Sequence, residues 1–464
     1  MTDRVGVLGM ARSGRAAARL ALGTGADVYV SDAGDDEDLR RVAEELRSAG
    51  ADVELGGHSV DTLARCDLIV VSPGIPPTAP VLADARLADV PRVSELEYGF
   101  RELRAPVIAV TGTNGKTTVT AWIAHLLDVA GARSEAAGNI GNALSEVALR
   151  DEQPEWVVVE ASSYQLGLVD TFAPRVGVLT NLAPDHLDRY PGVAEYYADK
   201  GHLFDNARPE STWVLNGDDV EVLRLAGDAP GRRFLFHTGA ENGAMDDGVE
   251  PPVCVGFVDL EGRLTLREGG RDEVLVRTNE LRLLGGHNHA NALAAALAAF
   301  AVTGDVVALR EGLRSFPPLR HRLEPLGEVA GVLWVNDSKA TNVASCRVAV
   351  ESMTRPTVLL LGGRHKGEDY GQLRDSLGHV KRVLAYGEAA DQVAAALDGV
   401  VDVERMTGSF EVVVRRAAEA AVPGDAVLLA PACASFDMFR DYEERGELFA
   451  RLVSELSGQV VDHG

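Results

Sequence analysis

The chain has 464 residues, of which 46% are hydrophobic and 25% are charged, and its formal net charge at pH 7 is −25. This length exceeds what one ordinary core holds and predicts about three globular domains. The acidic balance argues against nucleic acid as a partner, because such binding depends on Lys and Arg side chains that neutralise phosphates.

The composition also predicts a cytoplasmic protein that binds small molecules and not membranes. The longest apolar run, residues 292–302, is far shorter than the ~20 residues that span a bilayer. No basic N-terminal region precedes a long apolar segment, so a secretory signal is not expected. The cysteines form no CxxC pair, which favours reduced thiols that fill the core of a cytoplasmic protein. A monomer is expected. They are Cys66, Cys254, Cys346 and Cys433.

The first block of the chain alternates strand-like and helix-like segments. Strands are predicted at residues 4–8, 27–31 and 68–71, and helices at 13–22 and 36–49. This alternation indicates a parallel sheet with right-handed crossover connections.

Glycine turns and an acid follow the strands of this first block. The turn Gly9–Gly14 follows the first strand, and Asp32 ends the second. The pattern resembles a dinucleotide-binding fingerprint but lacks its central glycine, so a UDP-sugar can use the same turn and acid. The segment Ser72-Pro-Gly74-Ile follows the third strand at the same edge of the sheet. A nicotinamide-dependent oxidoreductase is one alternative at this point.

The most informative stretch is Val110–Thr118, VTGTNGKTT, between a strand-like and a helix-like segment. Backbone N–H groups and the positive end of the helix dipole would face a bound phosphate there. Lys116 would bridge the outer phosphates, and the Thr117 hydroxyl would hold a magnesium ion. Gly112 and Gly115 are closer together than in the usual P-loop. A glycine turn before a capped helix is the structural alternative.

The central block continues with further strands and ends in a linker. The region 253–284 has a hairpin-like pattern, and an Ala-rich helix is predicted from Asn288. The proline pair within Ser315–Arg322 interrupts both helix and strand, which predicts a linker. The strands are predicted at 156–160, 176–180 and 213–216.

Polar side chains of the central block lie at strand ends or on helix faces. Glu160 ends a strand and is placed to hold magnesium, or is a solvated acid. His186 lies between two aspartates and is a metal ligand, an acid–base group or a surface residue. Lys200 on the following helix has no role that the sequence alone assigns. Asn288 and Asn291 share a helix face, where they bind a purine edge or cap the helix.

Polar loops directly follow three strands of the third block. Because such loops share one sheet edge, Lys339, Lys366 and Ser435 predict an anion-binding rim suited to a small dicarboxylate. Ser435 is expected at a helix start, and phosphate binding would use similar groups. The strands are predicted at 332–335, 357–361, 383–386 and 426–430, and the loops are NDSKATN (336–342), GGRHKG (362–367) and PACASFD (431–437).

Taken together, these motifs resemble the Mur ligases of peptidoglycan synthesis over essentially the whole chain. The middle motifs are common to all Mur ligases, whereas NDSKATN and the PACASFD segment are typical of the glutamate-adding member. In chain order the motifs are SPGI, TGTNGKTT, GNIG, EASSYQL, APDHLDRY, HNxxNALAA, HR, NDSKATN, GGxxKGxD and PACASFDxFxxYxxRG.

The resemblance implies an α/β protein of three domains in series. A Rossmann-like domain at 1–103 would bind the UDP substrate, a P-loop ATPase-like domain at 104–319 would bind ATP, and a Rossmann-like domain at 320–464 would bind the amino acid. The implied activity is ATP-dependent addition of D-glutamate to UDP-N-acetylmuramoyl-L-alanine through an acyl phosphate. Two Mg²⁺ ions would assist this step of cytoplasmic cell-wall precursor synthesis.

The resemblance also implies roles for individual residues. The UDP substrate would contact Arg12, Ser13, Asp32, Ser72, Gly74, Asn139 and His186. ATP would contact Gly112, Thr113, Asn114, Gly115, Lys116, Thr117, Thr118, Asn288, Asn291, Arg322 and Asp337. Glutamate would contact Lys339, Thr341, Lys366, Ser435 and Tyr442. The metal ligands would be Thr117, Glu160, His186 and Lys200, the last as N6-carboxylysine, and the catalytic residues would be Lys116, His186 and Lys200.

Three positions depart from the family pattern, and two further alternatives stay open. Gly201, directly after Lys200, is an unusual residue within a helix. Ala33 replaces a frequent hydroxyl near the uracil, and Tyr442 replaces a frequent phenylalanine. Folylpolyglutamate synthetase also adds glutamate, but it has no N-terminal UDP-binding domain, so residues 1–103 argue against it. A regulatory P-loop ATPase without ligase chemistry is the other alternative.

Overall fold

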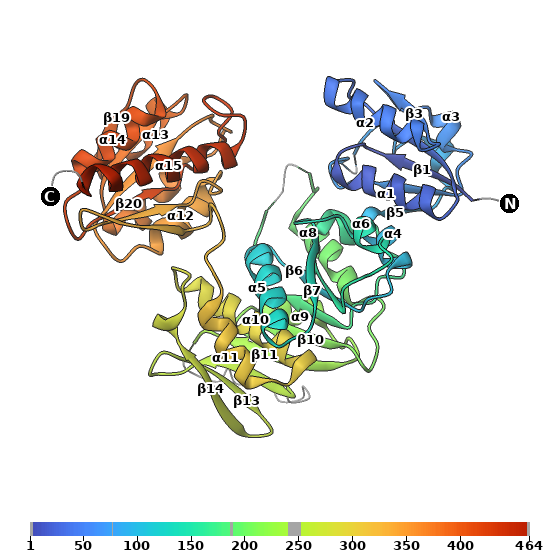
Figure 1. Cartoon of the computed structure of the whole chain (residues 1–464), viewed down its shortest axis with the longest axis horizontal. Helices are drawn as coiled ribbons and strands as arrows, with labels where there is room; N and C mark the ends of the chain where they lie inside the picture. Colours follow the sequence, from blue (N-terminus) through green and yellow to red (C-terminus); the bar gives the residue numbers. More distant parts are fainter. Residues whose placement is uncertain (1–2, 77, 186–188, 240–251, 462–464) are drawn as a thin grey trace. The chain divides into compact units, whose positions relative to one another are not determined.

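A computed structural model describes residues 3–76, 78–185, 189–239 and 252–461. It contains three sheets, each flanked by helices (Figure 1). The chain divides into two compact units, which are described separately. The first comprises Met1–Glu280 and His289–Arg314, and the second comprises Leu281–Asn288 and Ser315–Gly464.

The first sheet has five parallel strands in the order β3-β2-β1-β4-β5. Leu8 lies opposite Ser31 on one neighbour and Val71 on the other, so the loops after these strands share one edge. The strands are β1 (Arg4–Leu8), β2 (Asp27–Asp32), β3 (Asp52–Leu55), β4 (Leu68–Val71) and β5 (Arg92–Ser94), and the helices are α1 (Arg12–Gly23), α2 (Glu37–Ser48) and α3 (Val60–Leu63).

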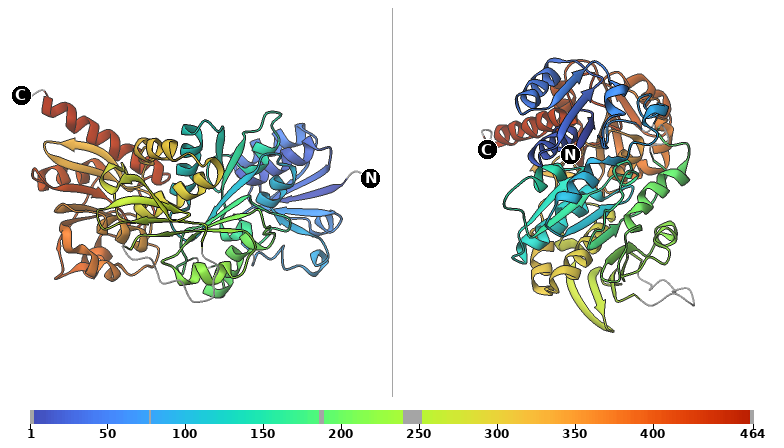
Figure 2. Two further views of the ribbon diagram at one scale, coloured as in Figure 1. Left: turned by 90° about the horizontal axis from the view of Figure 1, so that it is seen from below. Right: turned by 90° about the vertical axis from the view of Figure 1, so that its right-hand side faces the viewer.

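The second sheet has nine strands in the order β14-β13-β12-β11-β10-β9-β6-β8-β7. The strands β6 to β12 pair in parallel. The predicted hairpin region adds β13 and β14, which pair antiparallel at the edge next to β12. This hairpin extends from the edge of the sheet (Figure 2). The strands are β6 (Val107–Thr111), β7 (Ser134–Gly138), β8 (Trp156–Glu160), β9 (Val176–Leu179), β10 (Thr212–Asn216), β11 (Arg232–His237), β12 (Cys254–Val258), β13 (Arg263–Glu268) and β14 (Arg271–Arg277).

Helices cover the central sheet and join it to the first one. Leu96 on α4 packs in the core of the central sheet, whereas Tyr98 packs with Val7 of the first sheet. Ala148 on α6 also belongs to that first core, and α1 packs against both α4 and α6 (Figure 1). The helices are α4 (Glu95–Glu102), α5 (Lys116–Val129), α6 (Leu144–Ala148), α7 (Ser163–Leu166), α8 (Val193–Gly201), α9 (Val220–Ala226), α10 (His287–Thr303) and α11 (Val306–Ser315).

The third sheet has the order β15-β16-β20-β17-β18-β19, and only β15 is antiparallel to its neighbour. The sheet packs against its helices through two hydrophobic cores, one on each face. The strands are β15 (Glu324–Val329), β16 (Val332–Asn336), β17 (Thr357–Gly362), β18 (Val380–Tyr386), β19 (Asp402–Arg405) and β20 (Ala426–Leu429), and the helices are α12 (Val343–Glu351), α13 (Ala390–Leu397), α14 (Phe410–Ala420) and α15 (Tyr442–Val461).

One local prediction in this third block is wrong. Ser435 does not begin a helix, because α15 begins only at Tyr442. The backbone around Ser435 instead pairs with neighbouring loops: Ala432 N–H donates to the Ala340 carbonyl, and the Ala434 carbonyl accepts from Arg364 N–H, both at 2.8 Å. Ser435 opens only a single turn, in which its carbonyl accepts from Met438 N–H at 3.1 Å and from Phe439 N–H at 2.9 Å, and this turn does not continue into a helix.

Two predictions from composition can be compared with the described residues. All four cysteines are free and buried. No helix in the described part of the chain combines the length and apolar character that a membrane span requires.

Candidate active site

The phosphate loop lies between β6 and α5, at the carboxyl edge of the central sheet. Gly112 and Gly115 have φ values of 137° and 83°, which side chains rarely adopt. A Cβ at Gly112 would overlap Thr180 Oγ1, and one at Gly115 would overlap Asn291 Oδ1. Since α5 begins at Lys116, its first N–H groups face this loop. The loop therefore has the geometry of an anion cradle.

Replacing Gly112 with alanine should weaken binding of an ATP analogue at least ~10-fold and destabilise the fold by about 1–3 kcal/mol. The reason is steric: the new methyl group meets Thr180 and the φ is unfavourable. Calorimetric titration and urea unfolding measure the two effects. Gly458→Ala is the matched control, because no atom lies within 4 Å of its Cβ position. Unchanged nucleotide affinity in Gly112→Ala would contradict the assignment of the loop.

Two lysine amines share one carbonyl of this loop. Lys116 Nζ donates to the carbonyls of Gly112 at 3.0 Å and Thr113 at 2.7 Å. Lys200 Nζ donates to the same Gly112 carbonyl at 2.8 Å and lies 4.6 Å from the centre of the Tyr196 ring. Burial lowers the pKa of Lys200 well below its usual value, and the charge of Lys116 lowers it further. The structure thus places Lys200, which sequence alone could not assign, at the phosphate loop.

Glu160 supplies a carboxylate next to the loop. It ends β8 opposite Val110 of β6, and its Oε1 accepts from Asn139 Nδ2 at 2.8 Å. Its Oε2 is buried and accepts no hydrogen bond from the described residues. A buried carboxylate oxygen without a donor is costly, and a cation there would remove the cost.

These residues fit a bound Mg²⁺ ion. Thr117 and Glu160 can supply two hard oxygen ligands, and nucleotide phosphates usually supply more. Among the described residues no cluster of three or more His, Cys, Asp or Glu side chains could hold a metal. His186, a predicted ligand, lies outside the described residues.

The predicted UDP-binding loops meet at the carboxyl edge of the first sheet. Ser72 Oγ donates to the Gly9 carbonyl at 3.2 Å, and a Cβ at Gly14 would overlap that carbonyl. Both oxygens of Asp32 accept backbone N–H groups, from Met10 at 2.7 Å and Gly34 at 2.8 Å. Asp32 therefore orders the turn itself. Ser13 is buried beside it, and Gly74 has open space at its Cβ position.

Arg12 contacts the central domain instead of its own turn. Its guanidinium donates to the carbonyls of Gly138, Asn139 and Gly141 at 2.7–3.3 Å. Asn139, also predicted at the UDP substrate, bonds Glu160. The substrate roles of Arg12 and Asn139 stay predictions.

The predicted glutamate residues lie on three connected loops of the second unit and, for Tyr442, at the first residue of α15. Lys339 Nζ lies 5.4 Å from the centre of the Tyr442 ring, and the Tyr442 hydroxyl donates to Glu443 at 3.0 Å. The hydroxyl that distinguishes Tyr442 from phenylalanine is thus bonded. Ser435 is buried and Lys366 is exposed, whereas Thr341 is half-buried.

Sequence reasoning gave no role to Arg445, which is fully buried beneath these loops. Its guanidinium donates to Ser338 Oγ at 2.9 Å, to the Ser338 carbonyl at 2.8 Å and to the Cys433 carbonyl at 3.3 Å. No ion pair with an acid is found among the described residues. The only sequence signal was its place in the C-terminal motif, since a helical arginine usually lies in solvent.

Three predicted ATP residues, Asn288, Arg322 and Asp337, belong to the second unit. Asp337 Oδ1 accepts from Leu323 N–H at 3.1 Å. Burial raises the pKa of Asp337 to about 7, although this hydrogen bond and the charge of Arg322 act in the opposite direction. Asn288 Nδ2 donates to the Leu284 carbonyl at 2.6 Å.

Asp337 should make the protein less stable as the pH rises from about 4 to 7. The unfolded carboxyl loses its proton first, so the unfolded state binds fewer protons in this window and gains relative stability. The shift from 3.8 to about 7 corresponds to a cost on the order of 4 kcal/mol above pH 7. Urea unfolding of the wild type and Asp337→Asn between pH 4 and 8 measures it. A difference independent of pH would contradict the expectation; Asp375→Asn, on the surface of the same unit, is the control.

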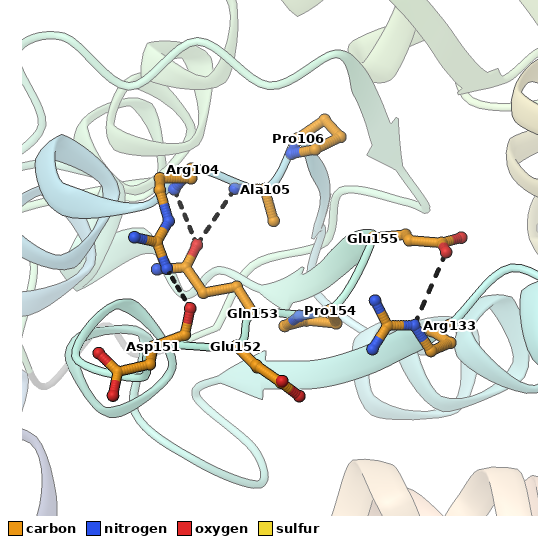
Figure 3. A pocket seen from close by; sticks show the side chains of 9 residues that line it. All are labelled: Arg104, Ala105, Pro106, Arg133, Asp151, Glu152, Gln153, Pro154 and Glu155. Carbon is orange, nitrogen blue, oxygen red and sulfur yellow. Dashed lines mark hydrogen bonds and ion pairs between the residues drawn. The ribbon is translucent and has the colours of Figure 1, made fainter.

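A cavity of about 620 Å³ lies at the other edge of the central sheet (Figure 3). The residues that line it come directly before β6, β7 and β8. The Arg104 and Ala105 N–H groups donate to Gln153 Oε1 at 2.9 and 3.3 Å. Because the phosphate loop follows β6, this cavity is not part of the candidate site. It is lined by Arg104, Ala105, Pro106, Arg133, Asp151, Glu152, Gln153, Pro154 and Glu155.

Comparison with known proteins agrees with this architecture. The model of the Mur ligase MurD-like N-terminal domain matches residues 3–94, that of the Mur ligase middle domain matches 110–299, and that of the Mur ligase glutamate ligase domain matches 321–433. The chain therefore belongs to the Mur ligase family, which confirms the family resemblance and the α/β fold class. The exact boundaries at 103 and 319 stay predictions.

Particular relatives cover almost the full length of the chain. The UDP-N-acetylmuramoylalanine–D-glutamate ligase of Salinibacter ruber is 41% identical, over 98% of each chain. The ligase of the same name from Syntrophotalea carbinolica is 40% identical, over 97% of each chain. The crystal structure of UDP-N-acetylmuramate-alanine ligase MurC from Thermotoga maritima has a TM-score of 0.59 at 19% identity. It covers 98% of this chain and 100% of that one, and shows the shared fold.

Proposed function

We propose that this chain is an ATP-dependent ligase that joins D-glutamate to UDP-N-acetylmuramoyl-L-alanine during peptidoglycan precursor synthesis. The observation that carries the proposal is the 41% identity, over 98% of both chains, to a D-glutamate ligase. The phosphate loop and the linked C-terminal loops provide side chains suited to ATP and to a small dicarboxylate.

The chemistry explains why a phosphate loop is needed. A carboxylate does not accept an amine, so transfer of the γ-phosphoryl group of ATP would first convert it into an acyl phosphate. Both reactants are anions, and Lys116 with the N-terminus of α5 would offset their charge. Bound Mg²⁺ would supply Lewis-acid stabilisation of the transferring phosphoryl group. The amine of D-glutamate would then displace phosphate, and either His186 or the phosphate would take its proton.

Lys200 would act as a carbamate that holds a second Mg²⁺ ion. Two amines on one buried carbonyl repel each other when both are charged. Conversion of Lys200 to N6-carboxylysine would replace that repulsion by attraction and would supply oxygen ligands, which a plain amine does not.

The remaining assignments complete the proposed site. Thr117 and Glu160 would bind the first Mg²⁺ ion, with the ATP phosphates on the loop Gly112–Thr118. The other predicted ATP, UDP-substrate and glutamate residues keep the roles that the family resemblance implies.

The decisive test is phosphate release by the purified protein against a panel of amino acids and UDP-muramoyl acceptors. We expect release only when both UDP-N-acetylmuramoyl-L-alanine and D-glutamate are present. With D-glutamate withheld, hydroxylamine should trap the acyl phosphate as a hydroxamate. Preference for another amino acid would overturn the substrate assignment, and release without either substrate would indicate a regulatory ATPase.

A further inference from the structure

We propose that Arg12 is a positioning residue that orients the carboxylate of Glu160 through the glycine loop Gly138–Gly141. The inference rests on the proposed function, in which Glu160 holds Mg²⁺. It assigns to Arg12 a task in the metal site, although Arg12 lies in the domain predicted to bind the UDP substrate.

The first step is the contact between Arg12 and the glycine loop. Nη1 donates to the Gly141 carbonyl at 2.7 Å, and Nη2 donates to the carbonyls of Gly138 at 3.3 Å and Asn139 at 3.2 Å. Gly138 and Gly141 have φ values of 94° and 59°. These left-handed conformations allow three carbonyls of one short loop to converge on a single guanidinium.

The second step is the contact between the glycine loop and Glu160. Asn139 N–H donates to the Glu160 carbonyl at 2.9 Å, and Asn139 Nδ2 donates to Glu160 Oε1 at 2.8 Å. A Cβ at Gly138 would lie 2.6 Å from the Glu160 carbonyl, so only glycine permits this approach. The loop thus fixes both the backbone and one carboxylate oxygen of Glu160, and leaves the buried Oε2 for a cation.

The position of Arg12 on a packed helix holds its guanidinium at the glycine loop. Arg12 is the first residue of α1, the next two residues are buried, and α1 packs against α4 and α6. A guanidinium presents several N–H groups in a rigid plane and can span three carbonyls, whereas a lysine ammonium is a compact point charge. The turn Gly9–Gly14 and the Glu160 carboxylate are therefore joined by one continuous set of hydrogen bonds, which predicts reciprocal coupling of the UDP and metal sites.

Titration with Mn²⁺, followed by electron paramagnetic resonance in the presence of a non-hydrolysable ATP analogue, tests this inference without turnover. Arg12→Met should weaken Mn²⁺ binding about 10-fold, which is within the range for residues that orient metal ligands. Arg12→Lys keeps the charge but should recover little of the loss. Arg19→Met is the matched control on α1, because its ion pair is with Glu45 and it should leave Mn²⁺ affinity unchanged.

A double-mutant cycle examines the route through the loop. Asn139→Ala alone should weaken Mn²⁺ binding, and adding Arg12→Met should cost much less than in the wild-type background. Full additivity of the two losses, or unchanged Mn²⁺ affinity in Arg12→Met with weaker UDP-substrate binding, would overturn the inference. The latter result would make Arg12 a substrate ligand only. Because the titration contains no amino acid, failure of the proposed function appears separately, as absence of D-glutamate-dependent phosphate release by the wild type.

Discussion

Replacing Lys200 with alanine should lower kcat on the order of 10³-fold while the protein stays folded. The side chain lies at the phosphate loop, 1% exposed, and its amine bonds the Gly112 carbonyl. A buried amine carries a desolvation cost, so its removal should change the free energy of unfolding little, and Lys200→Met, which fills the space, even less. Phosphate release under saturating substrates and urea unfolding measure the two quantities.

Two further measurements distinguish the carbamate from a plain amine. The wild type in ¹³C-bicarbonate should give a carbamate resonance that Lys200→Met lacks. Added acetate should restore part of the activity of Lys200→Ala, because it returns a carboxylate to the cavity. Lys200→Arg keeps a positive charge and should be as inactive as Lys200→Ala. Full activity of any of these variants would remove Lys200 from the mechanism.

Replacing Arg445 with alanine should destabilise the second unit by about 3–5 kcal/mol. The substitution removes a fully buried side chain and leaves the carbonyls of Ser338 and Cys433 without their donors. Urea unfolding measures the loss, and Arg451→Ala, on the exposed side of the same helix α15, should change stability by less than about 0.5 kcal/mol.

Arg445→Lys separates this structural role from an effect on the amino-acid site. An ammonium can keep one or two of the hydrogen bonds, so the variant should fold and show a raised KM for D-glutamate with an unchanged KM for ATP. Wild-type stability of Arg445→Ala would contradict the expectation, since buried carbonyls would then lose their partners at no cost.

The regular elements that carry the site were predictable because their sequence signals are local. β4 and β8 were predicted to the residue, and the phosphate loop was found from its glycines and Lys116. The strands β3 and β5 were missed. β3 (DVEL) includes two charged residues, whereas β4, equally short, is a continuous apolar run (LIVV), and β5 has only three residues. The prediction at Ser435 was wrong because the turn that begins there stops after one turn, and the next helix begins only at Tyr442.

The contacts that join distant segments were not predictable in the same way. Arg12 and Asn139 are more than a hundred positions apart, and nothing in either segment indicates that the guanidinium donates to the glycine loop. Lys200 looked like an ordinary helical charge until the structure placed it at Gly112. Residue types and spacing indicate which chemistry is available, whereas its assembly depends on packing between elements.

The position of α4 has a consequence for how the protein melts. One side of this helix carries Leu96 into the central core, and the other carries Tyr98 into the first core. Glu95 also accepts the Ser145 N–H at 2.7 Å and Glu97 accepts the Thr171 N–H at 2.9 Å, so the helix is bonded to the central part by buried acids. If either sheet unfolds and α4 detaches, the apolar core of the other sheet is exposed. Scanning calorimetry should therefore show the two sheets unfolding in a single transition.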